Sequence, residues 1–109
     1  MQRRKISRYL IEHQLANGNK FWTGKDKTVI EANERSSWWE VLTYGYKTPQ
    51  DAQKGIEALK RFDKRLGEPV GTYAVIGPLT VLLKPDELTY EYGNEGEIIE
   101  ISEEELAAI

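Results

Sequence analysis

The sequence predicts an α+β fold, in which a mainly antiparallel β-sheet carries one long amphipathic helix on one face. Residues 49–66 place apolar side chains at spacings of three and four between clear start and stop signals for a helix. The segments on both sides alternate apolar with polar residues and are separated by Gly, Asn and Pro, which is typical of strands and hairpins. We therefore expect two β-hairpins, the long helix and a short C-terminal tail that is helical or disordered.

The length and composition are those of a small folded protein. The 109 residues are enough for one hydrophobic core, so we expect a single domain over residues 1–101 and an acidic tail over residues 102–109. The absence of cysteine excludes disulfides and thiolate chemistry. Residues 1–8 are basic, but no apolar segment follows them and no apolar run is long enough to cross a bilayer. These features favour a cytoplasmic protein.

The first strands are expected near the N-terminus. Residues 6–15 alternate as a half-buried strand does, and Asn17-Gly18 is a strong hairpin signal because both residues tolerate positive φ. Residues 21–23 form the returning strand of this first hairpin. Residues 28–31 are expected to add a third, short strand.

The segment at residues 38–46 is rich in aromatic and β-branched side chains, which predicts a central strand that leads directly into the helix. Asn33 could instead cap a short helix that runs into Trp38 and Trp39. We favour a loop before Trp38. In a strand, Trp38 and Trp39 point to opposite faces of the sheet, so only one of them can belong to the same core.

The long helix has agreeing signals at both ends. Thr48 is its expected N-cap, Pro49 occupies the first helical position and Asp51 places a negative charge in the first turn. Gly67 is suited to the residue after the helix, and Pro69 prevents continuation. The apolar stripe expected to form the core comprises Ala52, Gly55, Ile56, Leu59, Phe62 and Leu66.

The C-terminal part is predicted to return to strands. Residues 70–76 and 79–83 are apolar strand segments, and Gly77-Pro78 between them indicates an edge or a corner. Residues 88–92 and 97–101 alternate on either side of a Gly-rich turn and predict the second hairpin. A capping box formed by Ser102 and Glu105 then predicts a short helix that must dock or fray.

The sequence offers little catalytic chemistry. His13 is the only histidine, and we interpret it as a structural residue, so we expect no metal site and no cofactor. Gly24-Lys25 does not match a phosphate-binding loop, because Asn19 and Asp26 occupy the positions that require Gly and Ser or Thr. No nucleophile, base and oxyanion arrangement is visible, so we do not expect an enzyme.

The charge is divided along the chain. Residues 1–65 carry 14 Lys and Arg against 8 Asp and Glu, whereas residues 66–109 carry 1 against 10. One interpretation is that the two halves fold together and their charges compensate. The other is that the basic half binds an anion, or that the acidic half binds a basic partner or mimics a polyanion.

Aromatic residues suggest a binding surface. Six of the eleven aromatic residues lie within residues 21–46, and Trp and Tyr dominate the energetics of protein interfaces. We therefore expect a small, non-enzymatic protein-binding or regulatory module, with a protein partner or self-association and no membrane partner. The candidate binding residues are Trp22, Trp38, Trp39, Tyr44 and Tyr46.

Two other functions remain open. The first is binding of single-stranded nucleic acid, with phosphates held by the basic half and bases stacked on aromatic rings. The second is inhibition of a nucleic-acid enzyme by the acidic half. The basic residues of the first alternative are Arg3, Arg4, Lys5, Arg8, Lys54, Arg61, Lys64 and Arg65.

The order of Tyr46-Lys47-Thr48, then Asp51-Ala52 on a helix, then Tyr73-Ala74-Val75-Ile76 loosely resembles small α+β domains of phage and bacterial proteins. It is also similar to the peptidoglycan-binding SPOR domain, in which a strand runs into a helix at a similar turn. The resemblance covers about a third of the chain and implies a phage or bacterial type of domain. It carries over no functional residue.

Overall fold

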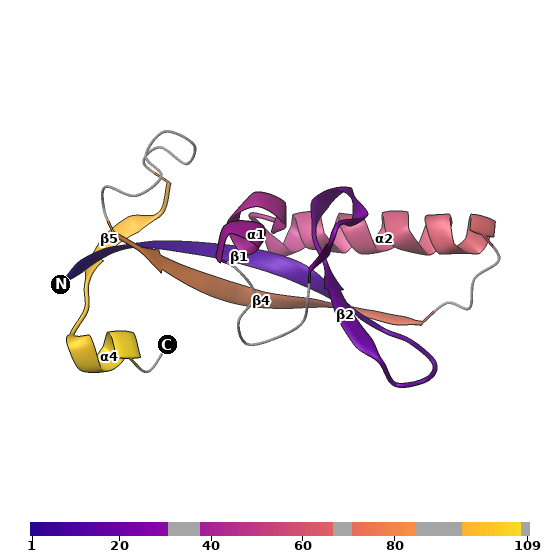
Figure 1. Ribbon diagram of the computed structural model, residues 1–109. Helices are drawn as coiled ribbons and strands as arrows, with labels where there is room; N and C mark the ends of the chain where they lie inside the picture. The colour runs from indigo at the N-terminus through magenta and orange to yellow at the C-terminus, as the bar shows by residue number, and fades with distance from the viewer. Residues whose placement is uncertain (31–37, 67–70, 85–94, 108–109) are drawn as a thin grey trace. The chain divides into compact units, whose positions relative to one another are not determined.

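The computed structural model describes residues 1–30, 38–66, 71–84 and 95–107 (Figure 1). The protein is α+β, and its described strands form a mostly antiparallel sheet of five. None of the described helices is long and apolar enough to cross a membrane. The elements in chain order are β1 (Gln2–Gln14), β2 (Lys20–Thr23), a 3-10 turn (Lys25–Lys27), β3 (Val29–Ile30), α1 (Trp38–Tyr44), α2 (Pro49–Leu66), β4 (Thr72–Leu83), β5 (Glu97–Glu100) and α4 (Glu103–Ala107).

The chain divides into two compact units. The central unit comprises Arg8–Leu79, and the terminal unit combines Met1–Ser7 with Thr80–Ile109. The strands β1 and β4 each contribute residues to both units.

The sheet of the central unit is built around β1. Its second half pairs antiparallel with β2, from Ile11 opposite Thr23 to Gln14 opposite Lys20. The turn between them places Gly18 at φ 89°, in the left-handed region that favours glycine. Next, β2 pairs with β3, and the strand order is β3-β2-β1-β4.

One cluster of the core lies between the sheet of the central unit and α2, which runs along β1 and β4 (Figure 1). Ile11 of β1 packs with the buried face of α2, and the sheet surrounds this cluster with half-buried tyrosines and a valine. His13 is also buried, between the rings of Phe21 at 4.7 Å and Tyr73 at 4.4 Å, which accords with the structural interpretation of this residue. The cluster comprises Ile11, Ala52, Ile56 and Leu59, with Tyr9, Tyr46, Tyr73 and Val75 packed against it.

The predicted strand at residues 38–46 is wrong. Residues 38–44 form α1, and only Tyr46 keeps a strand-like pairing, as an isolated bridge to Tyr9. The aromatic and β-branched composition favours a strand only when a sheet partner is present, whereas here the segment buries Val41 and Leu42 as a helix. Successive helical residues lie about 100° apart, so the opposite-face argument for Trp38 and Trp39 no longer applies.

Phe62 does not belong to the core, contrary to the expectation for the apolar stripe of α2. Its relative exposure is 41%, against 3% for Ile56. Ala52, Ile56 and Leu59 share one face of the helix, whereas Phe62 follows Gly55 by seven residues and lies with it on the flank of that face. The side chain of Leu66 lies outside the described ones.

The terminal unit pairs the start of β1 with β5, antiparallel from Gln2 opposite Glu100 to Lys5 opposite Glu97. Residues 88–92, the expected partner of residues 97–101 in the second hairpin, lie outside the described residues. The helix α4 begins at a cap in which the Glu105 amide donates to Ser102 Oγ at 3.1 Å. The buried apolar residues of this unit are Ile6, Val81, Leu83 and Ile101.

We expect Ile56→Ala to lower the free energy of unfolding by about 2–5 kcal/mol, because it leaves a cavity under α2. Phe62→Ala should cost less, on the order of 1 kcal/mol, because the ring is already partly in water. Urea unfolding followed by circular dichroism measures both. An equal loss in the two variants would contradict the described orientation of α2.

Candidate functional site

The most promising surface of the central unit is a groove beside the start of α2. It has a volume of about 470 Å³, and an adjoining hollow of about 480 Å³ shares Lys25 and Tyr46 with it. We call the two together the Tyr46 groove. Its lining residues are Lys25, Asp26, Thr43, Tyr44, Tyr46, Lys47, Asp51, Lys54 and Gly55.

Tyr46 is held in place by its backbone. The Tyr9 amide donates to the Tyr46 carbonyl and the Tyr46 amide donates to the Tyr9 carbonyl, both at 2.7 Å. Immediately before this pair, the Gly45 amide donates to the Val41 carbonyl at the end of α1. The short link between α1 and α2 is thereby fixed to the edge of β1.

The helix wall of the groove begins two residues after Tyr46. Thr48 caps α2, because its Oγ1 accepts from the Asp51 amide at 3.1 Å and its carbonyl accepts from the Ala52 amide at 3.2 Å. The first turns of α2 therefore follow directly from the Tyr9 pairing. This places Lys54 and Gly55 beside Tyr46.

The opposite wall is the tight turn between β2 and β3. The Gly24 amide donates to the Thr28 carbonyl at 2.9 Å, and the Thr28 amide donates to the Lys25 carbonyl at 3.2 Å. Asp26 lies in the left-handed region at φ 59°, which aspartate tolerates better than most residues. Two hydrogen bonds therefore hold the backbone that carries Lys25 and Asp26.

The side chain of Tyr46 fills the space above α2 where Gly55 lacks a side chain. A Cβ atom at position 55 would meet the Tyr46 hydroxyl oxygen and ring, and also the end of Ile11. Glycine in a helix interior costs about 1 kcal/mol relative to alanine. Gly55 is therefore explained by the close approach of Tyr46.

The groove carries three ammonium groups from three chain segments. Lys25, Lys47 and Lys54 are exposed, and none has a hydrogen bond or ion pair to another described residue through its side chain. Asp26 and Asp51 add two carboxylates to the same lining. The lining is thus mixed in sign with an excess of positive charge.

Tyr46 is chemically distinct from an exposed tyrosine. Burial raises the pKa of its phenol above the ordinary value of 10.0, and the nearby negative charge of Asp26 raises it further. The phenol therefore stays neutral near neutral pH. Its O–H donates to the Gly24 carbonyl only at the long distance of 3.5 Å, which leaves it able to turn toward a ligand.

The structure places the five predicted aromatic residues in different settings. Tyr44 and Tyr46 line the groove together. Trp22 pairs with Glu12 in the strand register, and both lie on the face of the sheet opposite to Ile11. The Nε1–H of Trp22 donates to Glu12 Oε2 at 3.4 Å. Trp38 and Trp39 begin α1, and their side chains are outside the described ones.

The predicted basic residues belong to two different units. Arg3, Arg4 and Lys5 belong to the terminal unit, where Arg4 Nη1 donates to the Glu95 carbonyl at 3.2 Å. Arg8 is only 2% exposed and its Nε donates to the Leu42 carbonyl at 3.4 Å, so it joins β1 to α1 instead of offering a surface charge.

The remaining basic residues lie on α2, in the central unit. Lys54 and Arg61 are exposed, and positions seven residues apart share one helix face. The side chains of Lys64 and Arg65 are outside the described ones.

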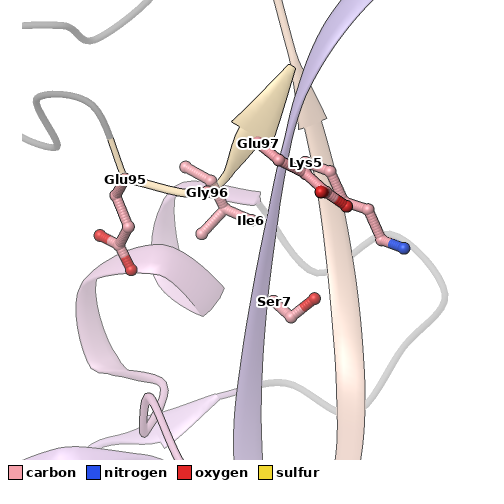
Figure 2. A pocket seen from close by; sticks show the side chains of 6 residues that line it. All are labelled: Lys5, Ile6, Ser7, Glu95, Gly96 and Glu97. Carbon is pink, nitrogen blue, oxygen red and sulfur yellow. The ribbon is translucent and has the colours of Figure 1, made fainter. Parts of the chain in front are cut away.

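A second hollow of about 480 Å³ lies in the terminal unit (Figure 2). In this view Lys5 extends away from Glu95, on the other side of β1, and Glu97 lies opposite Lys5 in the strand register. The described residues contain no group of three or more potential metal ligands. The charged groups of the hollow in the terminal unit do not converge on one point, so this hollow is a weaker candidate than the Tyr46 groove.

Sequence reasoning missed Lys25 and Lys47 as binding residues. In the sequence, Lys25 stands out only in a segment that fails to match a phosphate-binding loop, and Lys47 only within Tyr46-Lys47-Thr48. A signal was present for Lys47, because the capped start of α2 fixes its position next to Tyr46. No local signal brings Lys25 to the same place, since 21 positions separate it from Tyr46.

No protein-family model matches the chain, and no curated protein and no solved structure is significantly similar to it. The geometry and charge of the Tyr46 groove are therefore the basis on which a function can be inferred.

We expect Gly55→Ala to destabilise the protein, although alanine normally favours a helix interior. The new methyl group meets the Tyr46 hydroxyl, so the loss should be smaller in the Tyr46→Phe background. Urea unfolding of the four variants of this double-mutant cycle gives the coupling free energy. Stabilisation by Gly55→Ala in the wild-type background would contradict the described contact.

We expect the phenol of Tyr46 to titrate above the ordinary tyrosine value. Asp26→Asn should lower this pKa without restoring the ordinary value, because burial is the larger cause. Because the pKa of this phenol is higher in the folded state than in the unfolded state, its protonation contributes to the free energy of unfolding. This contribution is fully present below the unfolded-state pKa and is lost as pH rises through the folded-state pKa. NMR titration of ¹³Cζ-labelled tyrosines, assigned with Tyr46→Phe, measures the shift; an unshifted pKa of Tyr46 would refute it.

Proposed function

We propose that this protein is a non-enzymatic binding module that recognises a protein partner through the Tyr46 groove. The observation that carries the proposal is the convergence of Lys25, Lys47 and Lys54 around the half-buried Tyr46. These side chains come from three separate segments; backbone hydrogen bonds tie the segment before Lys47 to β1 and close the turn that carries Lys25. A groove held in this way loses little conformational entropy when a partner binds.

The chemistry of the groove suits a protein partner. Tyrosine combines a large apolar ring with a hydroxyl donor, and it is enriched among residues that dominate interface energetics. The three lysines have no competing partner among the described residues, so a ligand does not have to displace an existing ion pair. Mixed charge in the lining favours a ligand that carries both polar and charged groups.

Single-stranded nucleic acid is less well supported as a ligand. The side chain of Tyr46 packs against the core and Gly55, whereas base stacking needs an accessible ring face. Arg8, one of the expected phosphate contacts, is buried.

The proposal predicts that Lys47→Glu/Lys54→Glu loses partner binding while the fold is kept. The matched control is Lys60→Glu/Arg61→Glu, which makes the same change in net charge on exposed positions of α2 outside the groove lining. Affinity capture from a lysate of the source organism, followed by quantitative mass spectrometry, compares both variants with the wild type. The recovered partner should bind the groove variant roughly tenfold more weakly in calorimetry.

The proposal fails if the two double variants retain the same proteins to the same extent. If nuclease treatment removes the retained material, the ligand is a nucleic acid and the protein-binding proposal is also wrong. Circular dichroism of each variant verifies that folding is unchanged.

A further inference from the structure

We infer that the occupant of the Tyr46 groove is the acidic helix α4 of a second copy of this chain. This inference rests on the proposed function, because it names the partner for the same groove. It begins from the unequal charges of the two units. The central unit carries 11 Lys and Arg against 9 Asp and Glu, whereas the terminal unit carries 4 against 9. The unit that contains the groove is therefore positive, and the unit that contains α4 is strongly negative.

The acidic helix offers three consecutive carboxylates. Glu103, Glu104 and Glu105 are all exposed, and their side chains have no hydrogen bond or ion pair to another described residue. The Ser102 cap holds the first turn of this helix through the Glu105 amide. The backbone of the segment is therefore ordered while its carboxylates remain available.

The groove is opposite to this segment in net charge, because Lys25, Lys47 and Lys54 outnumber Asp26 and Asp51 in its lining. Three exposed ammonium groups, on Lys25, Lys47 and Lys54, surround a space of about 470 Å³. Successive helical side chains project about 100° apart, so three adjacent carboxylates can reach lysines on different walls of one groove. Tyr46 adds a neutral hydroxyl donor, since a phenol is protonated near neutral pH.

The inferred contact predicts a two-fold symmetric dimer that weakens as the salt concentration rises. If each copy gives its α4 to the other, the exchange is reciprocal and forms a closed dimer. Exposed ion pairs are weak and are screened over about 10 Å at 0.1 M salt. The association should therefore be weak, concentration-dependent and stronger at low ionic strength.

A charge-swap experiment on the full chain tests the inference. One variant reverses the groove, Lys47→Glu/Lys54→Glu, and a second reverses the helix, Glu103→Lys/Glu104→Lys/Glu105→Lys. Sedimentation velocity at low ionic strength should show self-association of the wild type and roughly tenfold weaker association of each variant alone. Mixing the two variants should restore association, because each reversed groove then meets a helix of opposite charge.

A matched mixture separates specific docking from attraction between oppositely charged proteins. The helix variant is mixed with Lys60→Glu/Arg61→Glu, whose net charge equals that of the groove variant. Docking of the reversed helix in the reversed groove predicts distinctly stronger association in the first mixture. Equal association in the two mixtures, or a wild type that stays monomeric at low ionic strength, overturns the inference.

Failure of the inference about α4 can be distinguished from failure of the proposed binding function. If the wild type is monomeric but a different protein is retained by the wild type and lost by Lys47→Glu/Lys54→Glu, the groove is a binding site and α4 is not its occupant. If neither self-association nor a groove-dependent partner is found, both the inference and the proposed function are wrong.

Discussion

The reciprocal backbone pair between Tyr9 and Tyr46 is the interaction on which the candidate site depends. Two hydrogen bonds of 2.7 Å fix a short link between two helices to the edge of β1. Because Thr48 begins the cap of α2 only two residues later, the pair also determines where that helix starts. A chain that lost this pair would keep its local capping signals but would no longer place α2 and the turn at Lys25 around one tyrosine.

Tyr46 serves both the fold and the groove. Its side chain packs against the cluster of Ile11, Ala52 and Ile56, and its hydroxyl takes the space that Gly55 leaves open. The same burial raises the pKa of the phenol. A residue with both roles has a well-defined position before a ligand arrives, which reduces the entropic cost of recognition.

The fold class could be predicted from the sequence because its signals are local. Alternation along a strand and a capping residue such as Thr48 or Ser102 act over two to four residues. The error at residues 38–46 has the opposite origin: the same aromatic and β-branched residues suit either a strand or a buried helix, and packing decides between them. Phe62 was misplaced because neighbouring positions at spacings of three and four differ in how directly they face the sheet.

The candidate site was only partly accessible from sequence. Tyr44, Tyr46 and Lys54 were recognised as potential binding residues, but in separate hypotheses, one for protein and one for nucleic acid. Their meeting with Lys25 and Lys47 depends on three segments that are distant along the chain, so no local pattern reveals it. Burial of Arg8 is likewise a tertiary effect, since α1 covers a strand position whose charge suggests exposure.

The most direct test of this account is native-state amide hydrogen exchange at Tyr9 and Tyr46. If their reciprocal pair organises the groove, both amides should exchange as slowly as the amides of β1 that pair with β2, with opening free energies close to that of global unfolding. Fast exchange at Tyr46, with the paired amides of β1 still protected, would mean that the link opens independently of the sheet. The Tyr46 groove would then not be a preformed site, and the central claim would be wrong.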